Sequence, residues 1–145
     1  MIQAKKQIHI DAPVDKVFAF AIEPENLIEI WPSLMKVDNI ERSSTEGINW
    51  DWEYKMAGMT FNGHSDTTEF KPNERVVTEN KEGIPSTFVW DYSAKDGGTT
   101  VDVVVEYNVP VPILGKLAEK VIIKMNENEM DTLLANLKAV MEAES

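Results

Sequence analysis

Hydrophobic and polar residues alternate with a period of two through the middle of the chain. The clearest example is Trp50-Asp51-Trp52-Glu53-Tyr54, in which the rings share one face and the carboxylates share the other. Phe88-Val89-Trp90-Asp91-Tyr92 repeats this arrangement, and Val101, Val103 and Tyr107 continue it in a third segment. A β-sheet with one packed face and one solvated face produces such a pattern. The middle of the chain is therefore predicted to form strands whose aromatic side chains point the same way.

Turn-forming residues divide this region into segments of hairpin length. Glycine, proline, asparagine and acidic residues gather near positions 45–47, 57–58, 72–74, 81–83 and 96–98. No helical pattern separates the segments, so we expect an antiparallel meander and not parallel α/β units. The expected strands are Gln3–Ile10, Met35–Ser44, Ile48–Met56, Thr60–Phe70, Val76–Asn80, Ser86–Ser93 and Thr99–Val109.

Two short helices are predicted directly after the first strand. Pro13 suits the first helical turn, where its missing N–H costs nothing, and apolar residues then recur at helical spacing as far as Ala21. The dipeptide Glu23-Pro24 interrupts this pattern. A second short helix is expected over Glu25–Ile30, ended by Trp31-Pro32.

The segment from Pro110 to the C-terminus is predicted to form one long helix. Its apolar stripe requires a cover, and only the preceding sheet can supply one. The predicted architecture is thus α+β, with an antiparallel sheet packed against a C-terminal helix. At about 100° per residue, the residues on the expected buried face are Ala118, Ile122, Met125, Leu133, Leu137 and Val140.

Composition excludes several classes of function. Apolar residues make up 43 % of the 145 residues, enough for the core of one domain spanning 1–145. The formal net charge of −11 argues against nucleic acid as a partner, since phosphate binding needs clusters of Lys and Arg. With no cysteine and only two histidines, a metal site is not expected, and no cofactor motif is present. No apolar run approaches the roughly 20 residues of a membrane span, so a cytoplasmic location is expected.

The aromatic faces of the strands are the main candidates for a functional site. Aromatic side chains bury large areas, so a solid core explains any single ring. The alternative is that a curved sheet and one helix leave a space between them, which large rings line as in apolar ligand pockets. On this second interpretation the ligand-binding residues are Trp50, Trp52, Tyr54, Phe61, Phe88, Trp90, Tyr92, Tyr107, Ile122, Met125 and Glu129.

Glu129 is the charged candidate on the long helix. It projects between Met125 and Leu133 of the expected apolar stripe, where a carboxylate is costly unless it is paired, hydrated or neutral. One interpretation is that its side chain reaches water, and the other is a polar patch in the wall of a cavity. By alternation, His64 and His9 are expected on the outer face of the sheet and not as general bases.

Short segments spread over nearly the whole chain carry a resemblance to a known family. They are Ile10–Phe18, Pro24–Leu27 with Trp31-Pro32, Thr68–Arg75, Leu114–Leu117 and Leu134–Lys138. Together, in this order and spacing, they resemble the polyketide cyclase/dehydrase and lipid transport family of the START-like, or birch-pollen-allergen-like (SRPBCC), superfamily. The resemblance implies a helix-grip fold, in which a curved antiparallel sheet of about seven strands surrounds a long C-terminal helix and two short helices close one end.

What the resemblance implies about function is a cavity between sheet and helix. Members of the superfamily hold lipids, sterols, polyketides, quinones or plant hormones there, so a small apolar or amphipathic ligand is the expected partner. Some members are cyclases or aromatases, but the family has no universal catalytic motif and the inner faces show no tuned acid–base pair, so no catalytic residue is assigned. The alternatives are a polyketide cyclase or dehydratase that uses Glu129 or a tyrosine, and a co-chaperone-like protein whose acidic outer face meets a basic partner.

Overall fold

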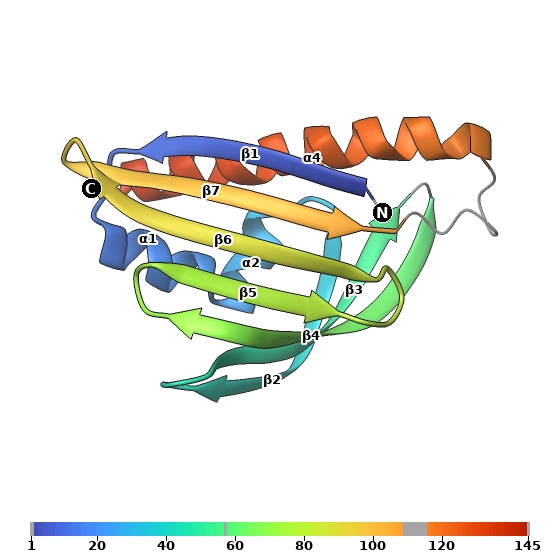
Figure 1. Ribbon diagram of the computed structural model, residues 1–145, viewed down its shortest axis with the longest axis horizontal. Coiled ribbons are helices and arrows are strands. Elements are labelled where there is room, and N and C mark those ends of the chain that lie inside the picture. The colour runs from blue at the N-terminus through green and yellow to red at the C-terminus, as the bar shows by residue number, and fades with distance from the viewer. Residues whose placement is uncertain (1, 57, 109–115, 145) are drawn as a thin grey trace.

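The computed structural model describes residues 2–56, 58–108 and 116–144 and, of residues 116–118, the backbone alone. Seven antiparallel strands form one curved sheet, and a long helix lies along its inner face (Figure 1). The α+β helix-grip architecture predicted from the sequence is confirmed. The elements are β1 Ile2–Ile10, α1 Val14–Ala21, α2 Pro24–Ile30, β2 Leu34–Ser43, β3 Gly47–Met56, β4 Met59–Lys71, β5 Arg75–Asn80, β6 Ser86–Lys95, β7 Gly98–Tyr107 and α4 Lys116–Ala143.

The sheet is a meander closed by its first strand. Its order is β1-β7-β6-β5-β4-β3-β2, so consecutive strands are neighbours except that β1 pairs with β7. Asp96 and Gly97, in the turn between β6 and β7, have φ angles of 50° and 77°, and positive φ at both residues matches the twist of a tight hairpin. The expected strand boundaries agree with the observed ones to within two residues, and the expected extension of the last strand to Val109 lies outside the described residues.

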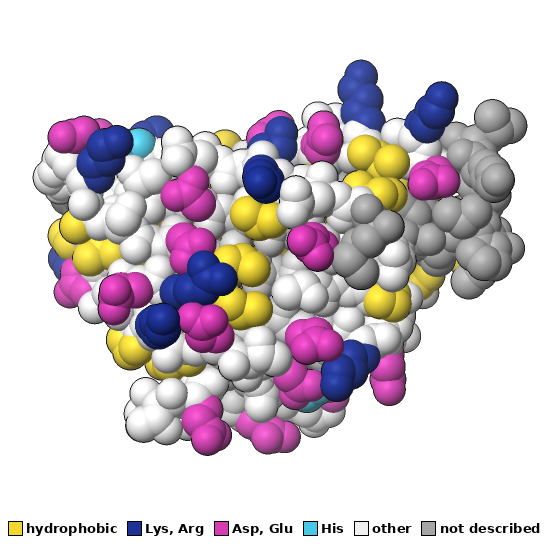
Figure 2. Space-filling view, viewed as in Figure 1, with side chains coloured by type: hydrophobic (Ala, Val, Ile, Leu, Met, Phe, Trp, Pro, Cys, Tyr) yellow, Lys and Arg dark blue, Asp and Glu magenta, His cyan; other side chains and the backbone are white. Residues whose placement is uncertain are grey.

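The outer face of the sheet is polar, as the alternation predicts. Arg75 on β5 donates from Nη1 to both carboxylate oxygens of Asp91 on β6, at 2.9 and 3.0 Å. Figure 2 shows acidic and basic side chains interspersed over this face of the molecule. Such exposed pairs contribute little to stability, on the order of 0–1 kcal/mol each, so the fold depends mainly on the inner face.

The two short helices are tied to the opposite end of the sheet from the N-terminus of α4 (Figure 1). The hydroxyl of Thr99, which is fully buried at the start of β7, donates to the carbonyl oxygen of Ala12 at 2.7 Å. Val17 and Phe18 of α1 then enter the core. Phe18 packs edge-on against Tyr92, with ring centroids 5.0 Å apart, which closes this end of the space between sheet and helix.

Helix α4 covers the inner face of the sheet with apolar side chains. Polar contacts fix its position: Nδ2 of Asn136 donates to the carbonyl oxygen of Ile30 at 2.9 Å, and Nζ of Lys138 donates to that of His9 at 2.9 Å. Its buried side chains are Ile122, Met130, Leu133, Leu134, Leu137 and Met141.

The buried face of α4 is rotated from the one that the sequence predicts. Met125 is 46 % exposed, so its predicted place on the covered face is wrong. At about 100° per residue, Met125 lies roughly 60° to one side of Ile122, whereas Met130 and Leu134 lie on the other side. The sheet covers the second side. The sequence makes the side with Met125 and the side with Met130 almost equally apolar, so the tertiary contacts of the helix decide which one is buried. Ala118 and the expected helical start at Pro110 fall outside what the structure describes.

Candidate functional site

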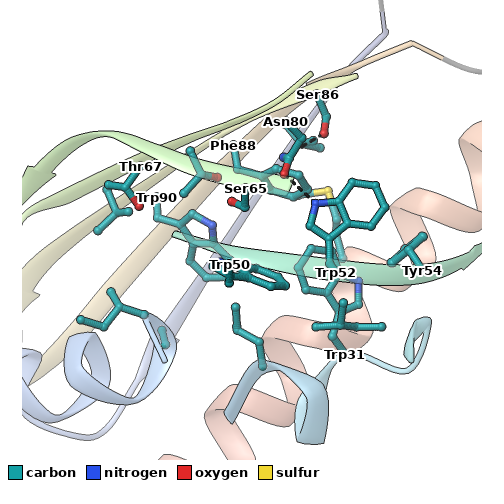
Figure 3. A pocket seen from close by; sticks show the side chains of 18 of the residues that line it. Trp31, Trp50, Trp52, Tyr54, Ser65, Thr67, Asn80, Ser86, Phe88 and Trp90 are labelled. Atoms are coloured by element: carbon teal, nitrogen blue, oxygen red, sulfur yellow. Dashed lines mark hydrogen bonds between the residues drawn. The ribbon is translucent and has the colours of Figure 1, made fainter. Parts of the chain in front are cut away.

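A cavity of about 120 Å³ lies between the inner face of the sheet and α4. Inward-facing residues of β3 to β7 form its floor and sides, α1 and α2 close one end, and α4 covers it. Figure 3 shows lining side chains, some of them labelled, converging on this space. The lining residues that enter the argument below are Trp31, Trp50, Trp52, Tyr54, Ser65, Thr67, Thr78, Asn80, Ser86, Phe88, Trp90, Tyr92, Val105, Tyr107, Asn126 and Glu129.

Aromatic rings make up much of the cavity wall. Trp50 and Trp52 come from β3 and Trp90 from β6, and all three are at least nine-tenths buried. Trp90 stacks on Tyr92 with ring centroids 6.3 Å apart. The period of two places these rings on one face, and the curvature of the sheet aims them at a common centre (Figure 3). The wall is thus mainly apolar and rigid.

A row of polar side chains crosses the inner face of the sheet. Strand register places Tyr107, Ser86, Asn80 and Ser65 side by side on four consecutive strands. Within the row, the side chain of Asn80 accepts a hydrogen bond from Nε1 of Trp52 at 2.9 Å and donates one to Oγ of Ser86 at 3.1 Å. The hydrogen bonds hold the Trp52 ring in one orientation, so the row also orders the apolar wall.

Tyr54 and Glu129 lie at the same end of the cavity. The backbone N–H of Ser33 donates to Oε1 of Glu129 at 2.6 Å, so the carboxylate is paired and not stranded. Burial, with a smaller contribution from the negative charge of Glu129, raises the pKa of Tyr54 to about 12, so the phenol stays protonated at neutral pH. Trp31 packs edge-on against Tyr54 with ring centroids 5.7 Å apart. Glu129 therefore anchors the α2–β2 connection that carries Trp31.

Most of the residues predicted to bind a ligand come together here, and three do not. Phe61 and Ile122 are buried but lie outside the cavity lining, and Met125 is exposed to solvent. Those lining the cavity are Trp50, Trp52, Tyr54, Phe88, Trp90, Tyr92, Tyr107 and Glu129.

Sequence reasoning missed several polar lining residues. Asn80 and Thr78 share the inner face of β5 with Val76. The alternation of residues along this strand predicts that all three side chains point inward. Trp31 follows a short helix, and its place over Phe88, at 5.6 Å between centroids, depends on where α2 docks.

Both histidines lie on the outer face, as expected, and His64 is the more strongly paired. Its Nδ1 lies 2.5 Å from Oδ1 of Asp51, and its Nε2 lies 3.1 Å from Oδ1 of Asp66. A hydrogen bond to Asp51 raises the pKa of His64, burial opposes the rise, and the charge of Asp66 adds to it. The cluster lies on the opposite face of the sheet from the cavity and is an ordinary ion-paired element of the surface.

His64→Gln is expected to remove a small pH-dependent part of the stability. Because the folded protein holds the proton of His64 more tightly than the unfolded chain, this stabilisation is complete below the ordinary pKa of 6.5 and is lost as the pH rises through the raised value. The side chain is 37 % exposed, so solvent screening limits the effect to about 1 kcal/mol or less. Urea unfolding of both proteins at pH 5.5 and pH 8.5 measures it. An equal difference at the two pH values would contradict the assignment.

The described residues form neither a metal-binding cluster nor a membrane-spanning helix. In the described ranges, no group of three or more His, Cys, Asp or Glu side chains is arranged to hold a metal ion. Over the same ranges, no helix combines the length and apolarity that crossing a bilayer requires.

Comparison with known proteins places the chain in a family. The sequence profile of the family described as polyketide cyclase / dehydrase and lipid transport matches residues 1–142. No curated protein sequence matches the chain significantly. Among solved structures, the protein TTHA0849 from Thermus thermophilus is similar at a TM-score of 0.85, with 20 % identity over 99 % of each chain.

Two further structures share the fold. The di-domain ARO/CYC StfQ from the steffimycin biosynthetic pathway is similar at a TM-score of 0.80 and 16 % identity, over 99 % of this chain and 52 % of StfQ. Ara h 8.0201 is similar at a TM-score of 0.69 and 13 % identity, over 98 % of each chain. Identities this low show a common fold alone. On the strength of the profile match over nearly its full length, the chain belongs to the polyketide cyclase/dehydrase and lipid transport family.

Proposed function

We propose that the protein binds a small, mainly apolar ligand with one polar end in the cavity between the sheet and α4. The observation that supports this most directly is the wall itself, since Trp50, Trp52 and Trp90 surround a space that α4 covers but does not fill. Apolar cavities hold water poorly and accept apolar guests. The polar end of the ligand lies toward Tyr54 and Tyr107, where the polar row meets α4.

The size of the cavity limits the ligand. Its volume of about 120 Å³ is below the roughly 300–1,000 Å³ of pockets for drug-sized ligands. A compact body, such as two fused rings, fits the space better than a long acyl chain or a sterol. Larger guests require displacement of a wall element, and every wall ring is held by packing or by a hydrogen bond of the kind that Asn80 makes with Trp52.

Thr78→Phe is expected to abolish binding by placing a ring in the middle of the cavity. Thr78 lines it from β5, next to Thr67 and Phe88 in the strand register. Calorimetric titration with 2-acetylnaphthalene and 2-isopropylnaphthalene measures binding directly. In the wild type, a probe at 100 times its dissociation constant also raises the free energy of unfolding by about 2.7 kcal/mol, and this gain is expected to vanish in the variant.

The matched control for this experiment is Thr87→Phe. Thr87 alternates with the lining residues Ser86 and Phe88 and pairs with Glu79, so it faces the outside of the sheet. The control places the same ring on the opposite face and is expected to leave both affinities unchanged. Probe binding that persists in Thr78→Phe would show that the probe binds outside this cavity. A wild-type protein that binds neither probe would count against the proposed function.

The corner formed by Tyr54 and Glu129 favours a second candidate, a cyclase-type enzyme. A protonated phenol beside a carboxylate provides a donor and an acceptor for enolate chemistry. The likeness of fold to StfQ points to the same class. Wild-type turnover of a poly-β-keto thioester that is lost in Glu129→Gln would establish this function, because glutamine still accepts from the Ser33 N–H. Absence of turnover in the wild type would exclude this substrate class.

A further inference from the structure

Two hydrogen-bond donors at the polar end of the cavity have no acceptor in the described part of the chain. They are the indole N–H of Trp31 and the hydroxyl of Tyr107, and both polar atoms are buried. A buried donor without an acceptor is costly and uncommon in native proteins. The ring of Trp31 packs against Phe88. Phe88 pairs with Val105 across β6 and β7, and Tyr107 lies two residues after Val105 on the same face of β7. Both donors thus lie near Phe88, Trp31 by ring contact and Tyr107 by its place in the strand register.

Asn80 and Ser86, the members of the polar row that follow Tyr107, are already hydrogen-bonded. Oδ1 of Asn80 accepts from Trp52, and Oγ of Ser86 accepts from Asn80. The same Ser86 hydroxyl donates to the carbonyl oxygen of Ile84 at 3.1 Å. Neither side chain therefore turns toward Trp31 or Tyr107 without giving up a hydrogen bond that it makes now.

Two further polar groups approach the donors without bonding them. Asn126 lies near enough to Tyr107 to oppose the rise in its pKa that burial causes, but not in hydrogen-bonding geometry. Trp31 lies near enough to the hydroxyl of Tyr54 to oppose the rise in the pKa of Tyr54, again without a hydrogen bond. What the site lacks is therefore a well-placed acceptor, which a guest in the cavity can supply.

The charged residues that line the cavity also limit which chemical groups can serve as the acceptor. No Lys, Arg or His is among the described residues that line it, and Glu129 is the carboxylate present. An anionic headgroup would face Glu129 and find no cation, which is unfavourable in a poorly hydrated site. An ammonium group would suit Glu129, but it carries only donors and would leave Trp31 and Tyr107 unpaired. A neutral acceptor meets both conditions.

We propose that the ligand is a neutral compound whose compact apolar body ends in a carbonyl oxygen, and that this oxygen accepts from Trp31 and Tyr107. The inference rests on the proposed function and narrows it from any small apolar guest to aromatic ketones, quinones and related carbonyl compounds. The ring system lies against Trp50, Trp52 and Trp90, and the carbonyl lies beside Phe88. Fatty-acid anions and amines are excluded by the same geometry.

A series of naphthalenes that differ in one substituent tests this inference. The probes are 2-acetylnaphthalene as the ketone, 2-isopropylnaphthalene as the hydrocarbon of the same shape, 2-naphthoate as the anion and 2-naphthylmethylammonium as the cation. Calorimetric titration at pH 7 is expected to show the ketone binding about tenfold more tightly than the hydrocarbon. Both charged probes are expected to bind about 100-fold more weakly than the ketone.

Trp31→Phe and Tyr107→Phe then identify the donors. Each keeps a ring and removes one donor, so each is expected to weaken ketone binding about tenfold while leaving the hydrocarbon unchanged. Because the Tyr107 hydroxyl has no partner in the described part of the free protein, Tyr107→Phe is also expected to melt a few degrees higher, about 3 °C. Thr87→Val is the control, since it removes one hydroxyl from the outer face of the sheet, away from the cavity lining, and should not affect ketone affinity.

The possible outcomes separate this inference from the proposed function. Binding of every probe with the anion or the amine tightest would overturn the carbonyl assignment and leave the cavity as the site. Equal losses for ketone and hydrocarbon in the Phe variants would show a packing role instead of hydrogen bonding and would likewise overturn it. No binding of any probe to the wild type would count against the proposed function itself, and this inference would fall with it.

Discussion

Leu137→Ala is expected to lower the free energy of unfolding by about 3–4 kcal/mol, the largest effect of a single truncation that the structure suggests. Leu137 has no exposed surface and lies midway along the buried face of α4, between Leu133 and Met141. Its loss removes buried methyl groups and leaves a void that the rigid sheet cannot close. Urea unfolding followed by circular dichroism measures the change, which corresponds to a fall in melting temperature of about 10 °C.

Met125→Ala is the matched control on the same helix. Methionine and leucine have similar volumes, but the Met125 side chain is 46 % exposed, so its truncation is expected to cost about 0.5 kcal/mol or less. Large effects at both positions would mean that the helix presents the face expected from the sequence stripe, which includes Leu137 as well as Met125. The pair therefore tests the rotation of α4 as well as the size of the core.

Gly63→Ala is expected to destabilise the protein by about 2 kcal/mol and to disturb the cavity. Gly63 pairs with Trp52 across β3 and β4, and the indole lies directly on its Cα. A methyl group at this position would overlap the ring, with Cη2 at 2.7 Å. The ring cannot slide away cheaply because Nε1 of Trp52 donates to Asn80. Chemical denaturation measures the loss, and calorimetry with 2-acetylnaphthalene measures the accompanying change in affinity.

A double-mutant cycle separates this clash from the intrinsic cost of alanine in the strand. In the background Trp52→Leu the overlapping ring is gone, so Gly63→Ala is expected to be nearly neutral there. The coupling free energy between the two positions is expected to be at least about 1 kcal/mol. An equal cost of Gly63→Ala in both backgrounds would show that the indole does not restrict this position.

The strands and their inner faces were predictable because a period of two depends only on local geometry. Trp50, Trp52 and Tyr54 must share a face in any extended conformation, and burial of large rings decides that the face is inward. The same alternation in β5 places Asn80 on the inner face, although Asn80 is polar and therefore not among the aromatic candidates. Polar residues on an inward face therefore predict positions that line a cavity, provided that the neighbouring strands are also known.

The face of α4 was not predictable from its own sequence. Met125 and Met130 are equally apolar, and each continues a stripe that contains Ile122 and Leu133. The choice between them depends on the docking of the helix, where Lys138 reaches the end of β1 and Asn136 reaches the end of α2. A helix can satisfy its own hydrogen bonds in any rotation, so only tertiary contacts select one.

The sequence by itself determined the class of fold, the order and approximate limits of the elements, and the set of rings that turn inward, because all of these follow from periodicities within single segments. The tertiary structure decided which of those rings border a cavity and which, like Phe61, are ordinary core. It also decided that Glu129 is paired with the Ser33 N–H, and that Trp31 and Tyr107 are buried donors without a partner among the described residues. These features join residues distant in the chain, and register and helix docking, which no single segment encodes, bring them together.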